Sequence, residues 1–138
     1  GIEPFLVASS IEATLARRPV RRLCHACKRP RPLDPGFLQS VGFPEKRLGG
    51  AVIYEAGGCE LCRNTGFKGR TGIYEVLPVT DRIRALVTAR EPASTIRNEA
   101  VRHDGMITLR EDGWSKVIAG VTTVEEVVRA SAEEESES

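Results

Sequence analysis

The sequence predicts an α+β protein, with short strands in its first half and helices in its second. Residues 51–55 ("AVIYE") and 71–79 ("TGIYEVLPV") are rich in the β-branched and aromatic side chains that favour strands. From Thr80 onward, apolar residues recur at intervals of three and four, which indicates helices. All four cysteines lie in the first half of the chain, in two C-x2-C pairs, so we expect a metal site there.

The beginning of the chain is predicted to form one helix followed by one strand. Residues 3–19 ("EPFLVASSIEATLARRP") place Pro4 where a first helical turn accepts proline, and Pro19 is expected to end the helix. Residues 20–24 ("VRRLC") then form a short strand that leads into the first cysteine pair. The apolar face of the helix would consist of Val7, Ile11 and Leu15.

The middle of the chain is predicted to be rich in loops. The segment 30–50 has prolines and glycines near each end and one helical turn at 35–42 ("PGFLQSVG"). The strands at 51–55 and 71–79 flank the second cysteine pair, so we expect them to pair with each other and to position it. With so little regular structure, bound metal is expected to do much of the folding here.

Four amphipathic helices are predicted between Thr80 and Ala130. Their apolar stripes are Ile83, Leu86 and Val87; Ile96, Ala100 and Val101; Trp114, Val117 and Ile118; and Val124, Val127 and Val128. Trp114 on such a stripe is expected to pack in the core and to bind no ligand. Because the stripes and caps are local, we expect this helical region to fold without the cysteine pairs.

The helix ends also carry sequence signals. Gly105 and Gly120 are placed as helix stops. The capping-box pairs are Thr108 with Glu111 and Thr122 with Glu125. The segment 132–138 lacks large apolar residues, so we expect it to be disordered.

The charge of the chain excludes one broad class of function. A net charge of +1 argues against a dedicated nucleic-acid binder, and no apolar run approaches the roughly eighteen residues of a membrane span. We therefore expect a soluble protein. The basic residues near the first cysteine pair favour a solvated face over a phosphate or acidic-partner site. They are Arg17, Arg18, Arg21, Arg22, Lys28, Arg29 and Arg31.

The cysteine pattern predicts one structural zinc ion. Two cysteines three positions apart reach one Zn²⁺ at about 2.3 Å, and a second such pair completes a closed four-thiolate shell. The predicted ligands are Cys24, Cys27, Cys59 and Cys62. Disulfides would need an oxidising compartment, and a thioredoxin-like site would not need a second pair. His25 and His103 are expected to be surface residues because the thiolates already fill the shell.

Four stretches together resemble the C-terminal end of the bacterial traffic ATPases of type II secretion and type IV pilus assembly. They are "EPFLVASS", "VRRLCHAC", "GCELCRNTGFKGRTGIYEVL" and "LREDGWSKVIAGVTTVEEVVR". The likeness covers the whole chain except the acidic tail, and the cysteine pairs followed by "GFKGRTGIYE" are its most specific part. Pro19 in "RRPVRR" departs from the family pattern, which has an apolar residue there.

The resemblance implies an identity for each segment. Residues 1–23 would be the last helix and strand of a RecA-like motor core, and residues 24–75 its zinc-binding subdomain. Residues 76–131 would be the C-terminal helical subdomain, and 132–138 the acidic tail. The chain contains no G-x-x-x-x-G-K-[ST] phosphate loop, so we expect no catalytic residue and no ATP hydrolysis in this region alone.

The resemblance also implies the setting. The parent protein would be a homohexamer that uses ATP and Mg²⁺ at the cytoplasmic face of the bacterial inner membrane. Its partners would be neighbouring subunits, an inner-membrane platform and associated secretion or pilus proteins, with no nucleic acid. Pilus assembly and type II secretion stay open as alternatives. Pilus retraction is disfavoured because the retraction relatives generally lack the cysteine pairs.

One further site residue is implied by the resemblance. Arg70 stands between Gly69 and Gly72, which would allow a tight loop that projects its side chain. In the resembling ATPases, the arginine of this motif is thought to lie near the nucleotide. The alternative is that Arg70 only forms a salt bridge with a local acid such as Glu75.

A second class of function stays open at this point. A zinc ribbon with basic neighbours could be a nucleic-acid or protein-recognition module. The near-neutral charge and the seven aromatic residues leave little for stacking on bases. Binding to DNA or RNA that weakens steeply with salt would favour this alternative.

Overall fold

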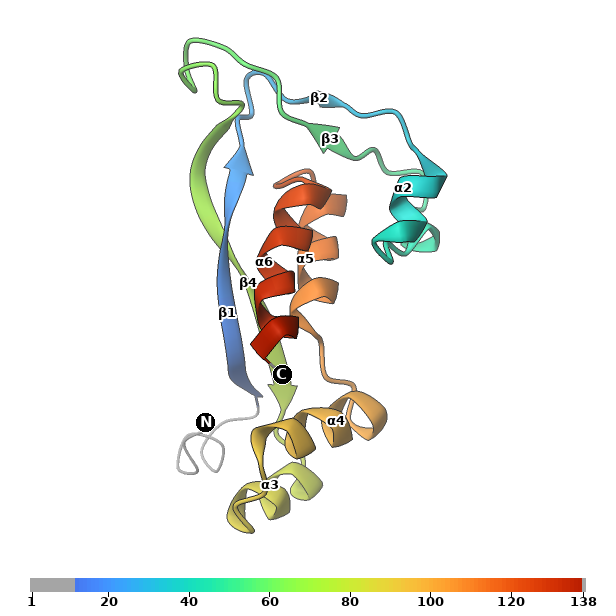
Figure 1. Ribbon diagram of the computed structural model, residues 1–138, viewed down its shortest axis with the longest axis vertical. Coiled ribbons are helices and arrows are strands. Elements are labelled where there is room, and N and C mark those ends of the chain that lie inside the picture. The colour runs from blue at the N-terminus through green and yellow to red at the C-terminus, as the bar shows by residue number, and fades with distance from the viewer. Residues whose placement is uncertain (1–11, 138) are drawn as a thin grey trace.

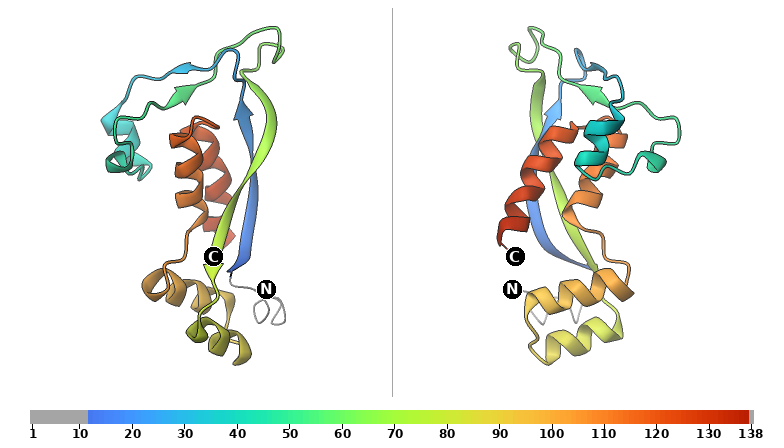
Figure 2. Two further views of the ribbon diagram at one scale, coloured as in Figure 1. Left: turned by 180° about the vertical axis from the view of Figure 1, so that it is seen from behind. Right: turned by 45° about the vertical axis from the view of Figure 1, so that its right-hand side comes forward.

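A two-stranded antiparallel ribbon forms the spine of the protein (Figure 1). The structure, a computed structural model, describes residues 12–137. Helices α5 and α6 lie side by side along the ribbon, helices α3 and α4 lie at one end of it, and the strands β2 and β3 with helix α2 extend from the other end (Figures 1 and 2). No helix among residues 12–137 is long and apolar enough to cross a membrane.

The spine consists of β1 (Glu12–Leu23) and β4 (Phe67–Pro78), paired from Glu12 opposite Pro78 to Leu23 opposite Phe67. The helix predicted over 3–19 is therefore wrong from residue 12 onward, and its first part lies outside the described residues. Pro19 does not end a helix but lies inside the ladder, opposite Gly72. The cause is tertiary: pairing with a strand about fifty residues away overrides a weak local helix preference.

The strand predicted at 51–55 does not pair with β4. Only Tyr54–Glu55 forms a strand, β3, and its partner is β2 (Arg29–Pro30). Because β1 matches β4 along almost its whole length, β4 needs no second partner, apart from an isolated bridge between Val76 and Ile107. The predicted strand at 20–24 is confirmed as the end of β1.

The loop-rich middle carries more apolar packing than the sequence suggested. The helical turn predicted at 35–42 is confirmed as α2 (Pro35–Ser40), where Asp34 accepts a hydrogen bond from the Phe37 amide, and a 3₁₀ turn, η1, follows at Glu45–Arg47. Phe43 meets Trp114 edge to face, with ring centroids 5.1 Å apart, which confirms Trp114 as a core residue. The shared core contains Leu38, Phe43, Leu48, Ile53, Trp114, Val117, Val124 and Val127.

The four predicted helices are confirmed: α3 (Asp81–Thr88), α4 (Ala93–His103), α5 (Leu109–Ile118) and α6 (Val124–Glu137). Helix α6 thus extends through most of the segment 132–138, for which the sequence predicts disorder. The predicted core position at Val101 is wrong, because its side chain is 48% exposed.

The helix caps follow the sequence with one exception. Thr108 accepts a hydrogen bond from the Glu111 amide, as predicted, and both Gly105 and Gly120 adopt the left-handed conformation of a helix stop. At α6, however, the capping oxygen belongs to Thr123, which accepts from the Glu126 amide. Thr122 instead donates its hydroxyl to the carbonyl oxygen of Arg21 on β1.

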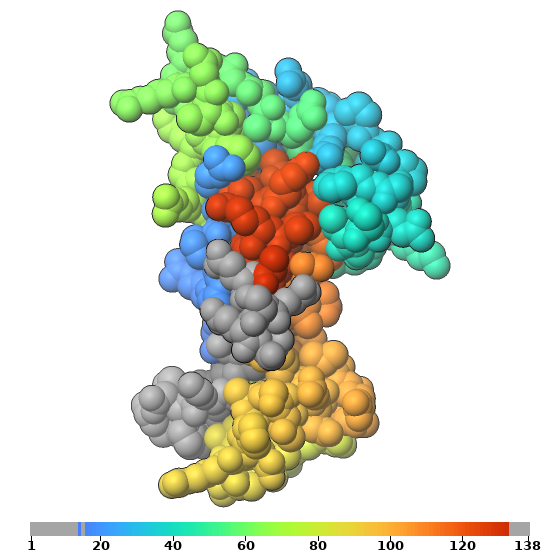
Figure 3. All heavy atoms as spheres, in the orientation of Figure 1, coloured from blue at the N-terminus to red at the C-terminus, as the bar shows by residue number. Residues whose placement is uncertain are grey.

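The helices pack in two separate places. Helices α3 and α4 have their own core against the end of β4, made of Leu77, Ile83, Val87, Ile96, Ala100 and Met106. Helices α5 and α6 pack on the ribbon through Val20, Ile73, Leu109 and Ala130. The space-filling view shows α6 between the atoms of β1 and those of the segment around α2 (Figure 3).

A buried carboxylate fastens α6 to β1. Glu126 is 3% exposed and accepts hydrogen bonds from the Arg21 amide at 2.8 Å, from Arg21 Nε at 3.0 Å and from Arg129 Nη2 at 2.8 Å. Burial alone would raise its pKa, but the hydrogen bonds and charges of Arg21 and Arg129 outweigh burial and hold the pKa of Glu126 below its ordinary value. The ionised form is therefore the one built into the fold.

Gly113 sets the distance between α5 and α6. A Cβ at this position would lie 2.4 Å from Cγ1 of Val127, so we predict that Gly113→Ala lowers the free energy of unfolding by about 1–3 kcal/mol through overpacking. Denaturant unfolding monitored by circular dichroism measures this. The control is Gly36→Ala on α2, where the nearest atom lies 3.5 Å away and a gain of about 0.4–1 kcal/mol is expected.

A double variant shows whether the Val127 contact is the cause. Adding Val127→Ala to Gly113→Ala should cost less than the sum of the two single changes, because the smaller side chain makes room for the new methyl group. Additive losses would show that the close approach of the two helices is not what requires glycine.

Candidate metal centre

The first cysteine pair is presented by the end of β1. Cys24 follows directly after Leu23, is fully buried, and donates its amide to the carbonyl oxygen of Gly66 at 2.9 Å. The chain then turns, since the amides of Cys27 and Lys28 both donate to the carbonyl oxygen of Cys24, at 3.3 and 3.0 Å. This turn brings the thiol of Cys27 next to that of Cys24.

The second cysteine pair lies on a tight turn just before β4. The amide of Asn64 donates to the carbonyl oxygen of Cys59 at 2.8 Å, and both Arg63 and Asn64 have positive φ. Two amides point at one sulfur: Cys59 N and Gly66 N lie 3.4 and 3.2 Å from Sγ of Cys62. Amide-to-sulfur bonds of this kind stabilise a thiolate.

Gly66 is a residue that the turn requires. Its φ is +82°, and a Cβ there would lie 2.5 Å from the Cβ of Ala56. The carbonyl oxygen of Gly66 also accepts the amide of Cys24, so this one residue contacts both cysteine pairs. The requirement for glycine at this position was not recognised from the sequence, although "TGF" between the second pair and β4 marks a turn.

The four thiols converge as the sequence predicted. Their Sγ atoms all lie within 4.8 Å of one another, with 3.8 Å between Cys24 and Cys59 and 3.7 Å between Cys27 and Cys62. A tetrahedral ion with metal–sulfur bonds of about 2.3 Å needs sulfur–sulfur edges of about 3.8 Å. The separations therefore fit one tetrahedral ion and are far longer than a disulfide bond of about 2.05 Å.

The donor set is compatible with structural zinc. All four ligand atoms are cysteine sulfurs, and this is the group of candidate ligands that the described residues bring together. The imidazoles do not belong to it, since His25 is exposed and His103 lies on α4, 3.7 Å from Glu99. The prediction that both histidines are surface residues is confirmed. A closed thiolate shell offers no position for a substrate.

The thiols do not ionise equally without a cation. Burial would raise the pKa of Cys62, but amide and thiol hydrogen bonds outweigh burial and lower it to about 6. At Cys27, burial and the thiols of Cys62, Cys24 and Cys59 raise the pKa to about 12. A bound cation would remove this difference in ionisation because it stabilises all four thiolates at once.

The metal centre is tied to the turn between α5 and α6. Lys28, in the first cysteine turn, donates Nζ to the carbonyl oxygen of Gly120 at 2.8 Å and lies over the ring of Tyr54 at 4.5 Å. The amide of Leu23 donates to the carbonyl oxygen of Val121 at 2.8 Å. These long-range bonds have no sequence signal, and they connect the cysteine pairs to the helices.

The basic cluster near the first cysteine pair is more than a solvated face. Arg21 binds Glu126, Arg29 binds Glu55 at 3.1 Å, and Arg31 binds Glu125 through both carboxylate oxygens. With Lys28 at Gly120, four of the seven residues thus bridge distant segments. The interpretation drawn from charge alone is corrected on this point.

Arg70 does not lie in a loop. It is an exposed residue of β4, directly opposite Arg21 in the ladder. Glu75, the acid proposed as its local partner, binds Arg97 at 2.9 Å. Among the described residues no ion pair involves Arg70. The structure therefore leaves its guanidinium available for an anion.

The chain resembles known proteins along nearly its whole length. The family model described as "Type II/IV secretion system protein" matches residues 1–129. The chain belongs to the type II/IV secretion system protein family. This membership confirms the resemblance to the traffic ATPases of secretion and pilus assembly.

Members of the family from several bacteria are similar to this chain. The type IV pilus assembly ATPase PilB of Thermus thermophilus is 43% identical over 96% of the chain, and the type II secretion system protein E of Dickeya dadantii is 42% identical over 97%. The type II secretion system ATPase E of Vibrio cholerae is 39% identical over 96%. The chain spans 15% of the first of these relatives and 26% of each of the other two.

The role of Gly66 can be tested through metal affinity. We predict that Gly66→Ala weakens zinc binding at least about tenfold, because it displaces groups that orient the sulfur ligands. The control is Gly69→Ala, whose φ of +81° is nearly the same but whose nearest new contact is 3.8 Å away. Competition with a coloured chelator measures both affinities. Equal weakening in the two variants would assign the effect to backbone strain and not to the contact with Ala56.

Proposed function

We propose that this chain is the C-terminal zinc-binding region of a hexameric traffic ATPase that powers pilin or pseudopilin assembly. The proposal includes both type IV pilus assembly and type II secretion, since relatives of the two kinds are similarly identical to the chain. ATP and Mg²⁺ would bind in the full-length protein. The region itself would have a structural and coupling role in the ATPase and would not catalyse the reaction.

The proposal is supported by the difference between the share of this chain and the share of each relative that the matches cover. Relatives named as pilus assembly or secretion ATPases match at least 95% of this chain, while the chain matches at most 26% of them. The sequence has no phosphate loop, so the hydrolytic machinery would lie in the remainder of the longer protein. The chain corresponds to one region of such an ATPase.

Zinc would serve as a structural clamp in this region. Its ligands would be Cys24, Cys27, Cys59 and Cys62, and it would supply charge that keeps all four thiolates ionised. Residues 24–75 would then be the zinc-binding subdomain, between the end of a RecA-like core at 1–23 and the helical subdomain at 76–131. The ion would hold the start of β4 against the end of β1.

The proposed setting follows from the same family. The protein would act at the cytoplasmic face of the inner membrane, with the rest of the ATPase, neighbouring subunits and a membrane platform as partners. The region would then transmit motion between the motor core and its neighbours through the ribbon and the α5–α6 pair. No nucleic acid is needed in this account.

Arg70 is the residue through which this region would reach the nucleotide. Its position on an exposed strand without an ion-pair partner among residues 12–137 supports such a role. A planar guanidinium can stabilise the charge that develops on transferring phosphates. In the assembled protein Arg70 would therefore contribute to turnover and not to folding.

We predict that Arg70→Ala in the full-length ATPase lowers turnover at least about tenfold, or about 1.4 kcal/mol of transition-state stabilisation. Steady-state ATP hydrolysis measures this, with metal content of one zinc per chain as the check on folding. The control is Lys68→Ala, an exposed cation two positions earlier on the same strand. Wild-type turnover in Arg70→Ala would refute the role, and a full-length protein without ATPase activity would refute the proposed function.

A further inference from the structure

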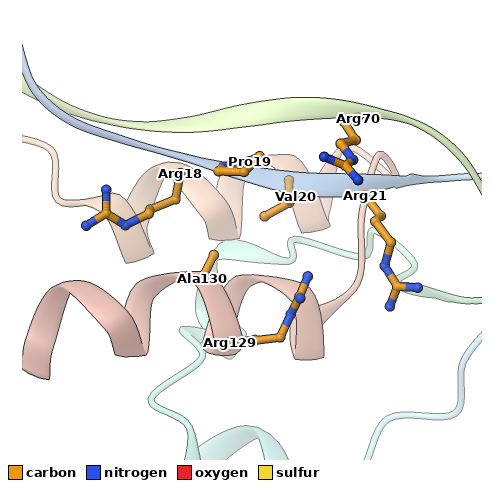
Figure 4. A pocket seen from close by; sticks show the side chains of 7 residues that line it. All are labelled: Arg18, Pro19, Val20, Arg21, Arg70, Arg129 and Ala130. Carbon is orange, nitrogen blue, oxygen red and sulfur yellow. The ribbon is translucent and has the colours of Figure 1, made fainter.

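Four arginines surround a cavity between the ribbon and α6. The cavity has a volume of about 220 Å³ and is lined by Arg18, Pro19, Val20, Arg21, Arg70, Arg129 and Ala130. Figure 4 shows the guanidinium of Arg70 extending from β4 toward β1 and that of Arg129 extending from α6 toward β1. None of the described residues that line it is acidic.

Within the described part of the chain, one carboxylate lies against the positive charge of the cavity. Arg21 and Arg129 share one carboxylate, Glu126, whose Oε1 lies 3.0 Å from Arg21 Nε and whose Oε2 lies 2.8 Å from Arg129 Nη2. Arg70 adds a further charge, and no ion pair within residues 12–137 compensates it. Arg21, Arg70 and Arg129 therefore bring three positive charges to the single carboxylate of Glu126.

The position of Arg70 opposite Arg21 breaks a rule of strand pairing. Like charges directly across an antiparallel ladder repel each other; Glu126 offsets the charge of Arg21, but no carboxylate among the described residues pairs with Arg70. Arg21 is bound by Glu126, and its guanidinium carbon lies 4.0 Å from the ring centroid of Phe67. Violations of local rules that the fold preserves in this way concentrate at functional sites.

The arginine side chains that line the cavity favour an anionic ligand. Guanidinium is always protonated and donates hydrogen bonds in a planar fork that matches phosphate oxygens. The cavity offers donors from three elements and an apolar floor of Pro19, Val20 and Ala130, with no side-chain acceptor for a neutral polar ligand. A tetrahedral anion with several oxygens and more than one negative charge fits this arrangement better than a single carboxylate.

We propose that this cavity binds a phosphate group of at least two negative charges, held by Arg70 and Arg129 and walled by the fixed Arg21. The proposal adds Arg129 to the role suggested above for Arg70 and locates the anion within this chain, between β1, β4 and α6. The phosphate can come from a nucleotide or from inorganic polyphosphate. Phosphate binding would stabilise the contact between the ribbon and α6, because it neutralises charges on both.

The direct test is titration of inorganic tripolyphosphate into the zinc-loaded chain at low ionic strength, followed by calorimetry. We expect saturable binding at one site that weakens as salt is added. Arg70→Gln and Arg129→Gln should each weaken it about tenfold, the loss expected for one charge-assisted hydrogen bond. The control is Arg102→Gln, an exposed arginine of α4 outside the cavity, for which at most about a twofold change is expected.

Two outcomes would overturn the proposal. One is the absence of saturable binding, and the other is equal weakening by Arg102→Gln, which would indicate adsorption to net positive charge. Arg70→Gln keeps the test decisive if Arg129→Gln disturbs Glu126, since Arg70 forms no ion pair with residues 12–137. Circular dichroism before each titration shows that the variants are folded.

A parallel titration with ATP separates the two sources of phosphate. Equal affinities for ATP and tripolyphosphate, both reduced by Arg70→Gln, mean that the cavity recognises the phosphate chain itself. Tighter ATP binding that is also reduced by Arg70→Gln supports a nucleotide as the source. ATP binding that Arg70→Gln leaves unchanged, without tripolyphosphate binding, contradicts the proposal. Tripolyphosphate binding, together with wild-type turnover of the Arg70→Ala full-length ATPase, would support the phosphate site in the cavity. It would refute only the role of Arg70 in turnover.

Discussion

The structure depends on the long antiparallel pairing of β1 with β4. Because Leu23 lies opposite Phe67 at one end of the ladder, the residues just beyond that end, Cys24 and Gly66, meet and form a backbone hydrogen bond of 2.9 Å. This contact brings together two cysteine pairs that are separated by more than thirty residues. The same pairing provides the surface on which α5 and α6 pack.

The metal centre and the helix pair are parts of one packed unit. The segment between the cysteine pairs contributes Leu38, Phe43, Leu48 and Ile53 to the core that contains Trp114. Lys28 and Leu23 add hydrogen bonds to the turn between the two helices. By contrast, α3 and α4 have their own core and contact the rest through the end of β4. The helical region is therefore divided, and only its second half packs against the segment between the cysteine pairs.

Local signals in the sequence predicted the parts of the fold that depend on local interactions. The C-x2-C spacing predicted the four cysteines whose thiols converge, and the apolar periods located all four helices, because turns and helices are set by neighbouring residues. The first part of β1, residues 12–19, was mistaken for a helix, since its conformation is decided by a partner far along the chain. The sequence predicted neither Phe43, in the loop-rich segment, nor Ile53, in the predicted strand at 51–55, as part of this core, for the same reason.

The two candidate sites also differ in how far local sequence signals could predict them. The thiol cluster could be predicted because a metal requires a fixed set of ligands at fixed spacing. The arginine cavity could not, because it joins residues of β1, β4 and α6 that no sequence period relates. Thr123 replaces Thr122 as the cap of α6 because Thr122 is engaged by the carbonyl oxygen of Arg21. Tertiary contacts thus determine which of the two adjacent threonines caps α6.

One metal ion would fasten the end of the ribbon and, through a shared core, support α5 and α6. Amide hydrogen exchange with and without a zinc chelator tests it most directly. Chelation should remove protection from the segment 24–66 and lower it in α5 and in α6, while α3 and α4 should keep theirs. Unchanged protection in α5 and α6 after complete zinc loss, or equal loss in all four helices, would contradict it.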